Sequence, residues 1–160
     1  MDHETYSDAY IRGIVRESKV IAMVGVSADW NRPSFFAMKY LQAKGFRILP
    51  VNPKEAGKEI LGEKVYARLT DITGPVDIVD CFRSPDAIPA LAADAIKIGA
   101  KVLWMQLGVR NDKAAATAEA AGLKVVMNRC PKIEYGRLSG EIGWLGINTK
   151  VISSKRYRKI

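Results

Sequence analysis

Short, continuous apolar runs alternate along this chain with segments whose apolar residues recur at helical spacing. The runs cover residues 19–25, 46–51, 76–82, 101–108 and 123–128. Runs of this kind are typical of strands that are buried on both faces, as they are in parallel sheets. Parallel strands that alternate with helices of about 10–12 residues are joined by right-handed crossovers. The sequence therefore predicts the α/β class: a Rossmann-like, doubly wound, five-stranded and mainly parallel sheet with helices on both faces.

The composition fits one small globular domain. The chain has 160 residues, of which 48% are apolar and 26% are charged, and this length buries one core without disulfides or metal ions. No apolar run approaches the roughly 20 residues that are needed to span a membrane. The first ten residues, MDHETYSDAY, are acidic and polar, unlike a secretory signal. We therefore expect a cytoplasmic protein with no membrane partner.

Few side chains on the predicted domain suit acid–base or metal chemistry. His3 is the single histidine and lies in the N-terminal tail, which excludes a Ser-His-Asp or Cys-His arrangement from the body of the domain. Cys81 and Cys130 are too few for a zinc site, so we predict no metal. These observations favour a binding protein over an enzyme. Cys130, flanked by Arg129 and Lys132, is either a small buried residue or a thiol that forms a mixed disulfide with a ligand.

The positive charge is concentrated at the C-terminus. The last eleven residues, KVISSKRYRKI, contain five basic residues and no acid, and the whole chain has a net charge of +8. A solvated tail explains this pattern, and binding of nucleic acid or another anionic partner is the less favoured alternative. Glycines at 136, 140, 143 and 146 interrupt any periodicity. We therefore divide the chain into a domain at 1–135 and an irregular, basic arm at 136–160, a candidate contact for a second copy or a protein partner.

The loop at 25–34 joins the first predicted strand to a helix and has the features of an anion site. Ligands of open parallel sheets bind beyond the C-terminal ends of the strands. Gly25 permits a tight turn, and the free N–H groups at the start of the next helix attract phosphate. Ser27 and Ser34 offer hydroxyl donors, and Arg32 offers a guanidinium. The alternative is a tight strand–helix turn that binds nothing.

The end of the second predicted strand distinguishes among nucleotides. The loop at 25–34 lacks the second and third glycines of the GxGxxG dinucleotide motif. NAD sites carry Asp or Glu after the second strand, whereas this chain has Asn52, Pro53 and Lys54 there. A lysine at this place attracts an additional phosphate on the ribose. The pattern argues against NAD and favours either NADP or the 3′-phosphate of coenzyme A.

Two further loops contribute polar groups to the same predicted edge. They contain Phe82, Arg83 and Ser84 after the third strand, and Gln106, Gly108 and Val109 after the fourth. In the first of these loops the ring is either a wall for an adenine, together with Pro53, or an ordinary core residue, and the guanidinium stacks on the base or reaches a phosphate. The second loop offers an amide and a close backbone approach, which suit an amide-bearing ligand arm.

Several of these segments resemble a known family. The runs are VGVSADWNRPSFFAMKYLQAKGFRILPVNPK, ILGEKVYARLTDI, VDIVDCFRSPDAIP, IGAKVLWMQLGV and VVMNRCPKIEY, which together cover roughly residues 10–135. They resemble the small bacterial and archaeal CoA-binding proteins, which are stand-alone relatives of the CoA-binding domain of the succinyl-CoA synthetase alpha subunit. The family segment MDRC-x-K-x-E-H differs here, because Asn128 and Tyr135 replace its acid and its histidine.

The resemblance implies which residues contact coenzyme A. The pyrophosphate and pantetheine side would be held by Gly25, Val26, Ser27, Arg32, Pro33 and Ser34. The ribose phosphate and adenine would lie between Asn52, Pro53 and Lys54 on one side and Phe82, Arg83 and Ser84 on the other, with Gln106, Gly108 and Val109 near the pantetheine. We therefore expect non-catalytic binding of coenzyme A or an acyl-CoA, for sequestration, sensing or presentation. The alternative is an NADP-binding oxidoreductase module or accessory subunit.

Overall fold

A single parallel sheet organises the protein. The computed structural model describes residues 1–140. Its five-stranded sheet has the order β2-β1-β5-β6-β7, with every neighbouring pair parallel. The strands are β1 (Val20–Val24), β2 (Arg47–Val51), β5 (Ile78–Cys81), β6 (Val102–Met105) and β7 (Lys124–Val126). The predicted fold class is confirmed, and each of the five apolar runs contains one of these strands.

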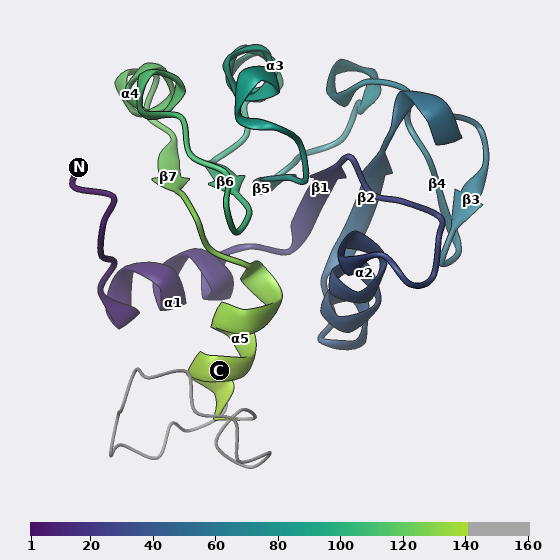
Figure 1. Ribbon diagram of the computed structural model, residues 1–160, viewed down its shortest axis with the longest axis horizontal. Helices are drawn as coiled ribbons and strands as arrows, with labels where there is room; N and C mark the ends of the chain where they lie inside the picture. The colour runs from purple at the N-terminus through teal and green to yellow at the C-terminus, as the bar shows by residue number, and fades with distance from the viewer. Residues whose placement is uncertain (141–160) are drawn as a thin grey trace.

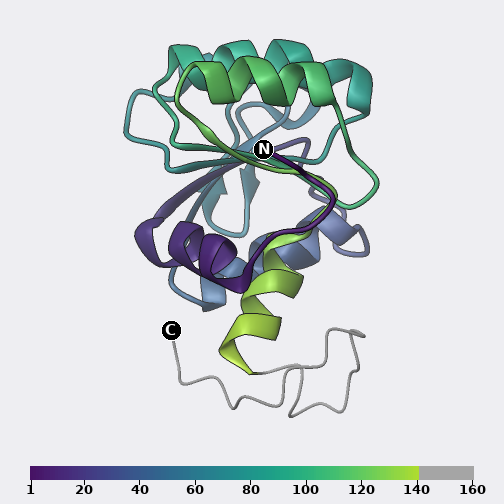
Figure 2. The same cartoon turned by 90° about the vertical axis from the view of Figure 1, so that its left-hand side faces the viewer.

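Helices cover both faces of the sheet. One face carries α1 (Asp8–Glu17), α2 (Pro33–Ala43) and α5 (Pro131–Ser139), and the other carries α3 (Ile88–Lys97) and α4 (Asp112–Ala120) (Figure 1 and Figure 2). The strand order explains this division. From β1 the chain moves outward to β2 through α2, and it later moves the opposite way from β5 to β7 through α3 and α4. Right-handed crossovers in opposite directions place their helices on opposite faces.

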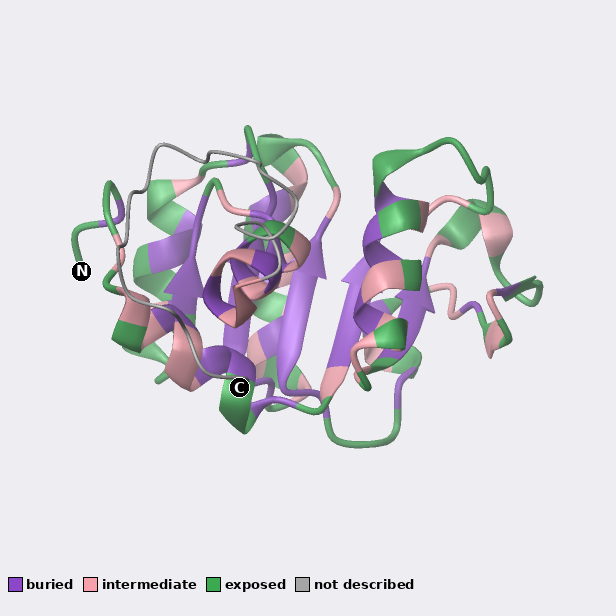
Figure 3. Ribbon diagram, turned by 90° about the horizontal axis from the view of Figure 1, so that it is seen from below, coloured by how far each residue is buried: buried purple, intermediate pink, exposed green. Residues whose placement is uncertain are grey.

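The core consists of two apolar layers separated by the sheet. Alternate residues of each strand point to opposite faces, so Ala22 and Val24 join the layer under α3 and α4, while Ile21 and Met23 join the layer under α1 and α2. The strands are buried throughout nearly all of their length (Figure 3). None of the helices within residues 1–140 is long and apolar enough to cross a membrane.

The connection from β2 to β5 contains a small hairpin that the sequence did not predict. Strands β3 (Glu59–Ile60) and β4 (Glu63–Lys64) pair antiparallel, in a stretch that lies outside the five apolar runs. Leu61 and Gly62 form the turn, and both have positive φ angles of 48° and 81°. A two-residue hairpin turn of this type favours Asn-Gly or Asp-Gly. Leucine at the first position therefore conceals the turn from sequence reasoning.

The chain is helical beyond residue 136, where we predicted the start of an irregular arm. Helix α5 continues to Ser139 and ends at Gly140, which has a φ of 84°. Gly136 is buried inside the helix instead of ending it, and Gly140 is the left-handed residue that closes the helix. Arg137 reinforces α5 through ion pairs with Asp8 and Glu134. The basic tail and the rest of the arm, residues 141–160, lie outside the described residues.

Both edges of the sheet are covered by other parts of the chain. At β7 the Tyr6 hydroxyl accepts the N–H of Met127 at 2.8 Å. The Tyr10 hydroxyl accepts the N–H of Val125 and donates to its carbonyl oxygen. At β2 the backbone of Tyr66 pairs with the strand end, since its N–H donates to Pro50 and its carbonyl accepts from Asn52. Part of the backbone at each edge therefore has partners within residues 1–140.

Candidate functional site

The predicted site residues lie at one edge of the sheet. All five strands are parallel, so the loops at 25–32, 52–54, 82–84 and 106–109 leave the sheet on the same side. Strands β1 and β5 are neighbours whose connections run in opposite directions. This is the switch point at which open α/β sheets bind their ligands.

Gly25 is the point at which the first loop contacts the loops on either side. Its N–H donates to the carbonyl oxygen of Val51 at 2.8 Å. Its φ of 89° lies in the left-handed region, and a Cβ atom built on it would lie 2.3 Å from the carbonyl oxygen of Phe82. A side chain at this position is thus excluded both by backbone strain and by the close approach of the loop that follows β5. Here glycine is required for the loops to come together.

Asn52 ties the loop after β2 to the loop after β1. Its side-chain Nδ2 donates to the carbonyl oxygen of Val26 at 2.8 Å, and its Oδ1 accepts the backbone N–H of Lys54 at 3.0 Å. The second bond forms the start of a short 3-10 turn over Pro53–Glu55. One side chain therefore orients Pro53 and Lys54 beside the first loop.

The loop at 25–32 contacts the first turn of helix α2. Pro33 occupies the first helical turn, and the side chain of the N-cap residue Arg32 does not cap it. Ser34 is buried, and its hydroxyl oxygen accepts the N–H of Ser27 at 3.0 Å. The hydroxyl hydrogen of Ser34 remains able to donate. Because the N-terminus carries the positive end of the helix dipole, this turn has the properties of an anion site.

Three cationic side chains come from the three loops around this turn. They are Arg32, Lys54 and Arg83, and all three are exposed. Lys54 and Arg83 form no ion pair within residues 1–140, and the Arg32 guanidinium lies 4.0 Å from the Asp29 carboxylate. Phe82 is half-buried and packs against the core layer under α2, which is the ordinary packing role that we left open for it. Ser84, which is exposed, precedes a 3-10 turn over Pro85–Ala87.

The fourth loop is more firmly held than the sequence suggested. Gln106 is buried, and its Nε2 donates to both carboxylate oxygens of Asp80, at 2.8 and 3.0 Å. Gly108, with a φ of 77°, donates its N–H to Oδ1 of Asn128 at 2.8 Å. Val109 is 9% exposed. The amide nitrogen of Gln106, which we expected to face a ligand, is instead occupied by a carboxyl group beneath it.

Sequence reasoning missed Asp80 and Asn128. Asp80 interrupts the apolar run at 76–82, and that interruption was the available signal. It is completely buried, and desolvation raises its pKa to about 8, although the hydrogen bond from Gln106 acts in the opposite direction. Asn128 adopts a φ of 54°, a conformation that asparagine tolerates better than most residues. Burial likewise raises the pKa of the Cys81 and Cys130 thiols, which disfavours the thiolate.

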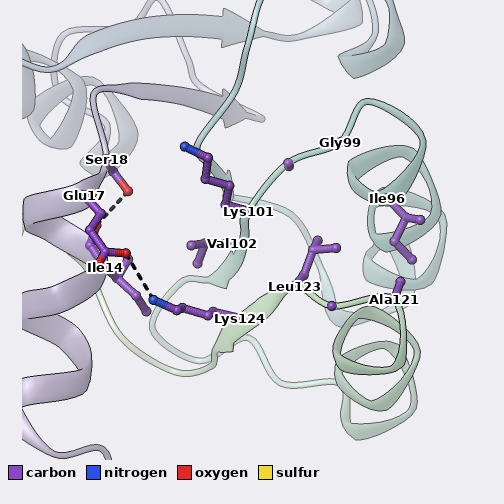
Figure 4. A pocket seen from close by; sticks show the side chains of 12 residues that line it. Ile14, Glu17, Ser18, Ile96, Gly99, Lys101, Val102, Ala121, Leu123 and Lys124 are labelled. Carbon is purple, nitrogen blue, oxygen red and sulfur yellow. Dashed lines mark hydrogen bonds and ion pairs between the residues drawn. The ribbon is translucent and has the colours of Figure 1, made fainter.

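A separate pocket of about 460 Å³ lies at the opposite edge, where the strands begin (Figure 4). Its lining combines apolar side chains such as Ile14 and Leu123 with two lysines. Lys101 pairs with Asp77 at 2.8 Å and Lys124 pairs with Glu17 at 3.3 Å. None of the predicted site residues lines this pocket.

Comparison with known proteins identifies the family. The model of the CoA binding domain matches residues 19–136. The chain belongs to this CoA-binding domain family. The match spans the sheet from the end of α1 into α5, and it includes all four loops described above. The family resemblance noted in the sequence is thereby confirmed.

Two relatives and one structural neighbour with the same fold each match most of this chain. The uncharacterized protein YneT of Bacillus subtilis is 37% identical over 129 residues, which cover 81% of this chain and 94% of YneT. A hypothetical protein from Pyrococcus horikoshii has a solved structure with a TM-score of 0.79 and 38% identity, covering 86% of this chain and 99% of that one. A dinucleotide-forming acetyl-coenzyme A synthetase of Ca. Korarchaeum cryptofilum shares the fold at 22% identity and a TM-score of 0.60, over 69% of this chain and 26% of that one.

Proposed function

We propose that this protein binds coenzyme A or an acyl-CoA at the C-terminal edge of its sheet, without chemistry of its own. The observation that carries the proposal is the joining of three loops around the start of α2. Gly25 contacts Val51 and approaches Phe82, and Asn52 holds Val26. The result is one rigid edge with three exposed cations. Such an edge suits a ligand that carries several phosphates.

Each part of coenzyme A has a matching group at this edge. The pyrophosphate would lie over the start of α2, where the hydroxyl groups of Ser27 and Ser34 and the guanidinium of Arg32 offer donors. The 3′-phosphate would pair with Lys54, and the adenine would lie between Pro53 and the Phe82–Arg83 segment. The pantetheine arm would then pass over the loop at 106–109.

The groups at this edge support binding rather than acid–base catalysis. The cations and hydroxyls donate hydrogen bonds that orient a ligand, and no carboxylate or imidazole is among the residues proposed to contact it. The buried carboxyl of Asp80 lies behind Gln106. His3 lies elsewhere, near Glu119 of α4 and in contact with Tyr6 beside β7. Sequestering, sensing or presenting the ligand therefore fits this edge better than transforming it.

Isothermal titration calorimetry with four ligands tests the proposal. Coenzyme A should bind more tightly than 3′-dephospho-CoA, NADP and NAD. Lys54→Ala should weaken coenzyme A binding about tenfold, the effect of losing one charge-assisted contact, and should leave 3′-dephospho-CoA binding unchanged. Lys64→Ala is the matched control, because Lys64 is an exposed lysine on the nearby hairpin. Tighter binding of NADP would instead indicate a redox module or accessory subunit, and no binding of any of the four would refute the proposal.

A further inference from the structure

Asp80 is a carboxyl group in the middle of the sheet, directly under the fourth loop of the site. It belongs to the central strand β5, and its exposed fraction is 0%. Its register partners on the neighbouring strands are Met23 and Trp104, both of which are completely buried. Gln106 supplies the two hydrogen bonds that the carboxyl oxygens accept. An uncharged amide compensates only part of the cost of burying a carboxylate.

No cationic side chain within residues 1–140 stabilises the ionised form of Asp80. Desolvation raises its pKa, and the Gln106 bond is the opposing influence; no lysine, arginine or histidine of residues 1–140 contributes. The titratable groups that respond to its charge are the thiols of Cys81, its neighbour on β5, and of Cys130 at the start of α5. Lys132 acts on Cys130 but is not among the influences on Asp80. Asp80 therefore changes charge in a range that a protein meets in solution.

The two protonation states of Asp80 favour opposite orientations of the Gln106 amide. An ionised carboxylate accepts from Nε2, as the structure shows. A neutral carboxyl has an O–H that can donate, and Oε1 of the same amide is an acceptor that can reach it. Half a turn of the amide brings Oε1 to the carboxyl and releases Nε2. Protonation thus changes which atom of Gln106 is left for contacts other than Asp80.

We propose that Asp80 and Gln106 form a proton-dependent switch that sets the ligand affinity of this edge, with neutral Asp80 as the binding form. The inference rests on the proposed function, since coenzyme A is the ligand that it concerns. Two physical reasons give the direction. A buried negative charge repels an anionic ligand, and a ligand that covers the edge excludes more water from the carboxyl. By linkage, ligand binding then takes up a proton.

The test measures coenzyme A affinity by calorimetry at constant ionic strength between about pH 7 and about pH 9.5. The wild type should bind about tenfold more weakly at the upper end. This is the change expected if ligand binding raises the pKa of Asp80 by about one unit. Asp80→Asn keeps the shape of the neutral carboxyl and cannot ionise. It should therefore bind with nearly the same affinity throughout this range. Asp94→Asn, on α3, is the control that should keep the wild-type profile. Ionisation of the ligand affects all three proteins alike.

A measurement without ligand keeps the inference testable if Asp80→Asn does not fold. The side-chain NH₂ resonances of Gln106, assigned by their loss in Gln106→Met, should shift in one step with pH in the free wild-type protein. Resonances that do not shift would overturn the switch. An affinity that is constant with pH, or that varies equally in wild type and Asp80→Asn, would also overturn it and leave the proposed function standing. No binding at any pH, with Gln106 resonances that titrate, would overturn the proposed function instead.

Discussion

The side-chain amide of Asn52 donates a hydrogen bond to the carbonyl oxygen of Val26 at 2.8 Å. The bond joins the end of β2 to the loop that precedes α2. Asn52 also accepts the N–H of Lys54, so its two polar atoms serve two different loops. The parts of the edge proposed to hold the adenine side and the pyrophosphate of the ligand are thereby kept in one arrangement, and less entropy is lost when the ligand binds.

Replacing Asn52 should therefore weaken both ligand binding and the fold. In Asn52→Ala we expect coenzyme A affinity to fall about tenfold and the free energy of unfolding to fall by about 1–2 kcal/mol, the cost of losing partly buried hydrogen bonds. Calorimetry and urea unfolding measure the two effects. Gln42→Ala is the control, because Gln42 donates a comparable bond to Leu61 from α2 without contacting the edge. Equal losses of affinity in both variants would contradict the assignment.

Two glycines with nearly the same backbone conformation should respond differently to alanine. Gly25 and Gly45 have φ angles of 89° and 94°. A Cβ at Gly45 meets nothing within 4 Å, whereas at Gly25 it would lie 2.3 Å from a backbone oxygen. Gly45→Ala should cost about 1 kcal/mol from backbone strain alone, and Gly25→Ala about 3 kcal/mol or more. Thermal unfolding of the two variants compares these values, and similar losses would show that the β1 and β5 loops can separate.

The stability of the fold should fall with rising pH because of Asp80. Its pKa is near 3.8 in an unfolded chain and about 8 in the folded protein. Between these values the folded state holds a proton that the unfolded state has released, so the free energy of unfolding decreases as the pH rises, by at most about 1.4 kcal/mol per pH unit. Asp80→Asn lacks this contribution. Urea unfolding of both proteins from about pH 5 to about pH 8 should give a wild-type free energy of unfolding that falls relative to that of Asp80→Asn as the pH rises; parallel curves would mean that Asp80 is ionised in the folded protein.

Removal of the Tyr10 hydroxyl should destabilise the edge at β7. Tyr10→Phe leaves the N–H and the carbonyl of Val125 without this partner, so we expect a loss of about 1–3 kcal/mol in the free energy of unfolding. Tyr66→Phe is the control, because Tyr66 makes its edge contacts through its backbone. Hydrogen exchange at Val125 gives a local measurement, and it should accelerate in Tyr10→Phe alone. Unchanged exchange would show that the hydroxyl does not protect the strand.

The strands and the meeting of their C-terminal loops at one edge could be predicted from the sequence because both follow from local patterns. Runs such as 19–25 are apolar on both faces, and the parallel order brings their C-terminal ends together. The start of α2 could also be predicted, because proline is favoured in a first helical turn and Pro33 lies there. Helix α5 was missed because Gly136 and Gly140 were both interpreted as breaks, although only the second ends the helix.

The contacts between loops could not be predicted, because they depend on strand register. The contact between Asp80 and Gln106 depends on the register of β5 and β6. Asp80 lies opposite Trp104, and Gln106 follows Trp104 by two residues along the chain. Similarly, Gly108 meets Asn128 through the alignment of β6 with β7. Local sequence shows that each residue is unusual in its surroundings, but it does not show which residue on another strand is its partner.

The contacts at the two sheet edges favour joining this domain to other domains in one chain. At β7 Tyr6 and Tyr10 bind outward-facing backbone groups, and at β2 the backbone of Tyr66 binds the end of the strand, so part of each edge is occupied within residues 1–140. A unit of this kind can be joined in tandem to other domains without pairing wrongly with their strands. The same fold occupies 26% of the acetyl-coenzyme A synthetase from Ca. Korarchaeum cryptofilum. A fusion that transfers this domain to another protein should therefore include Tyr6 and Tyr10 as well as the sheet.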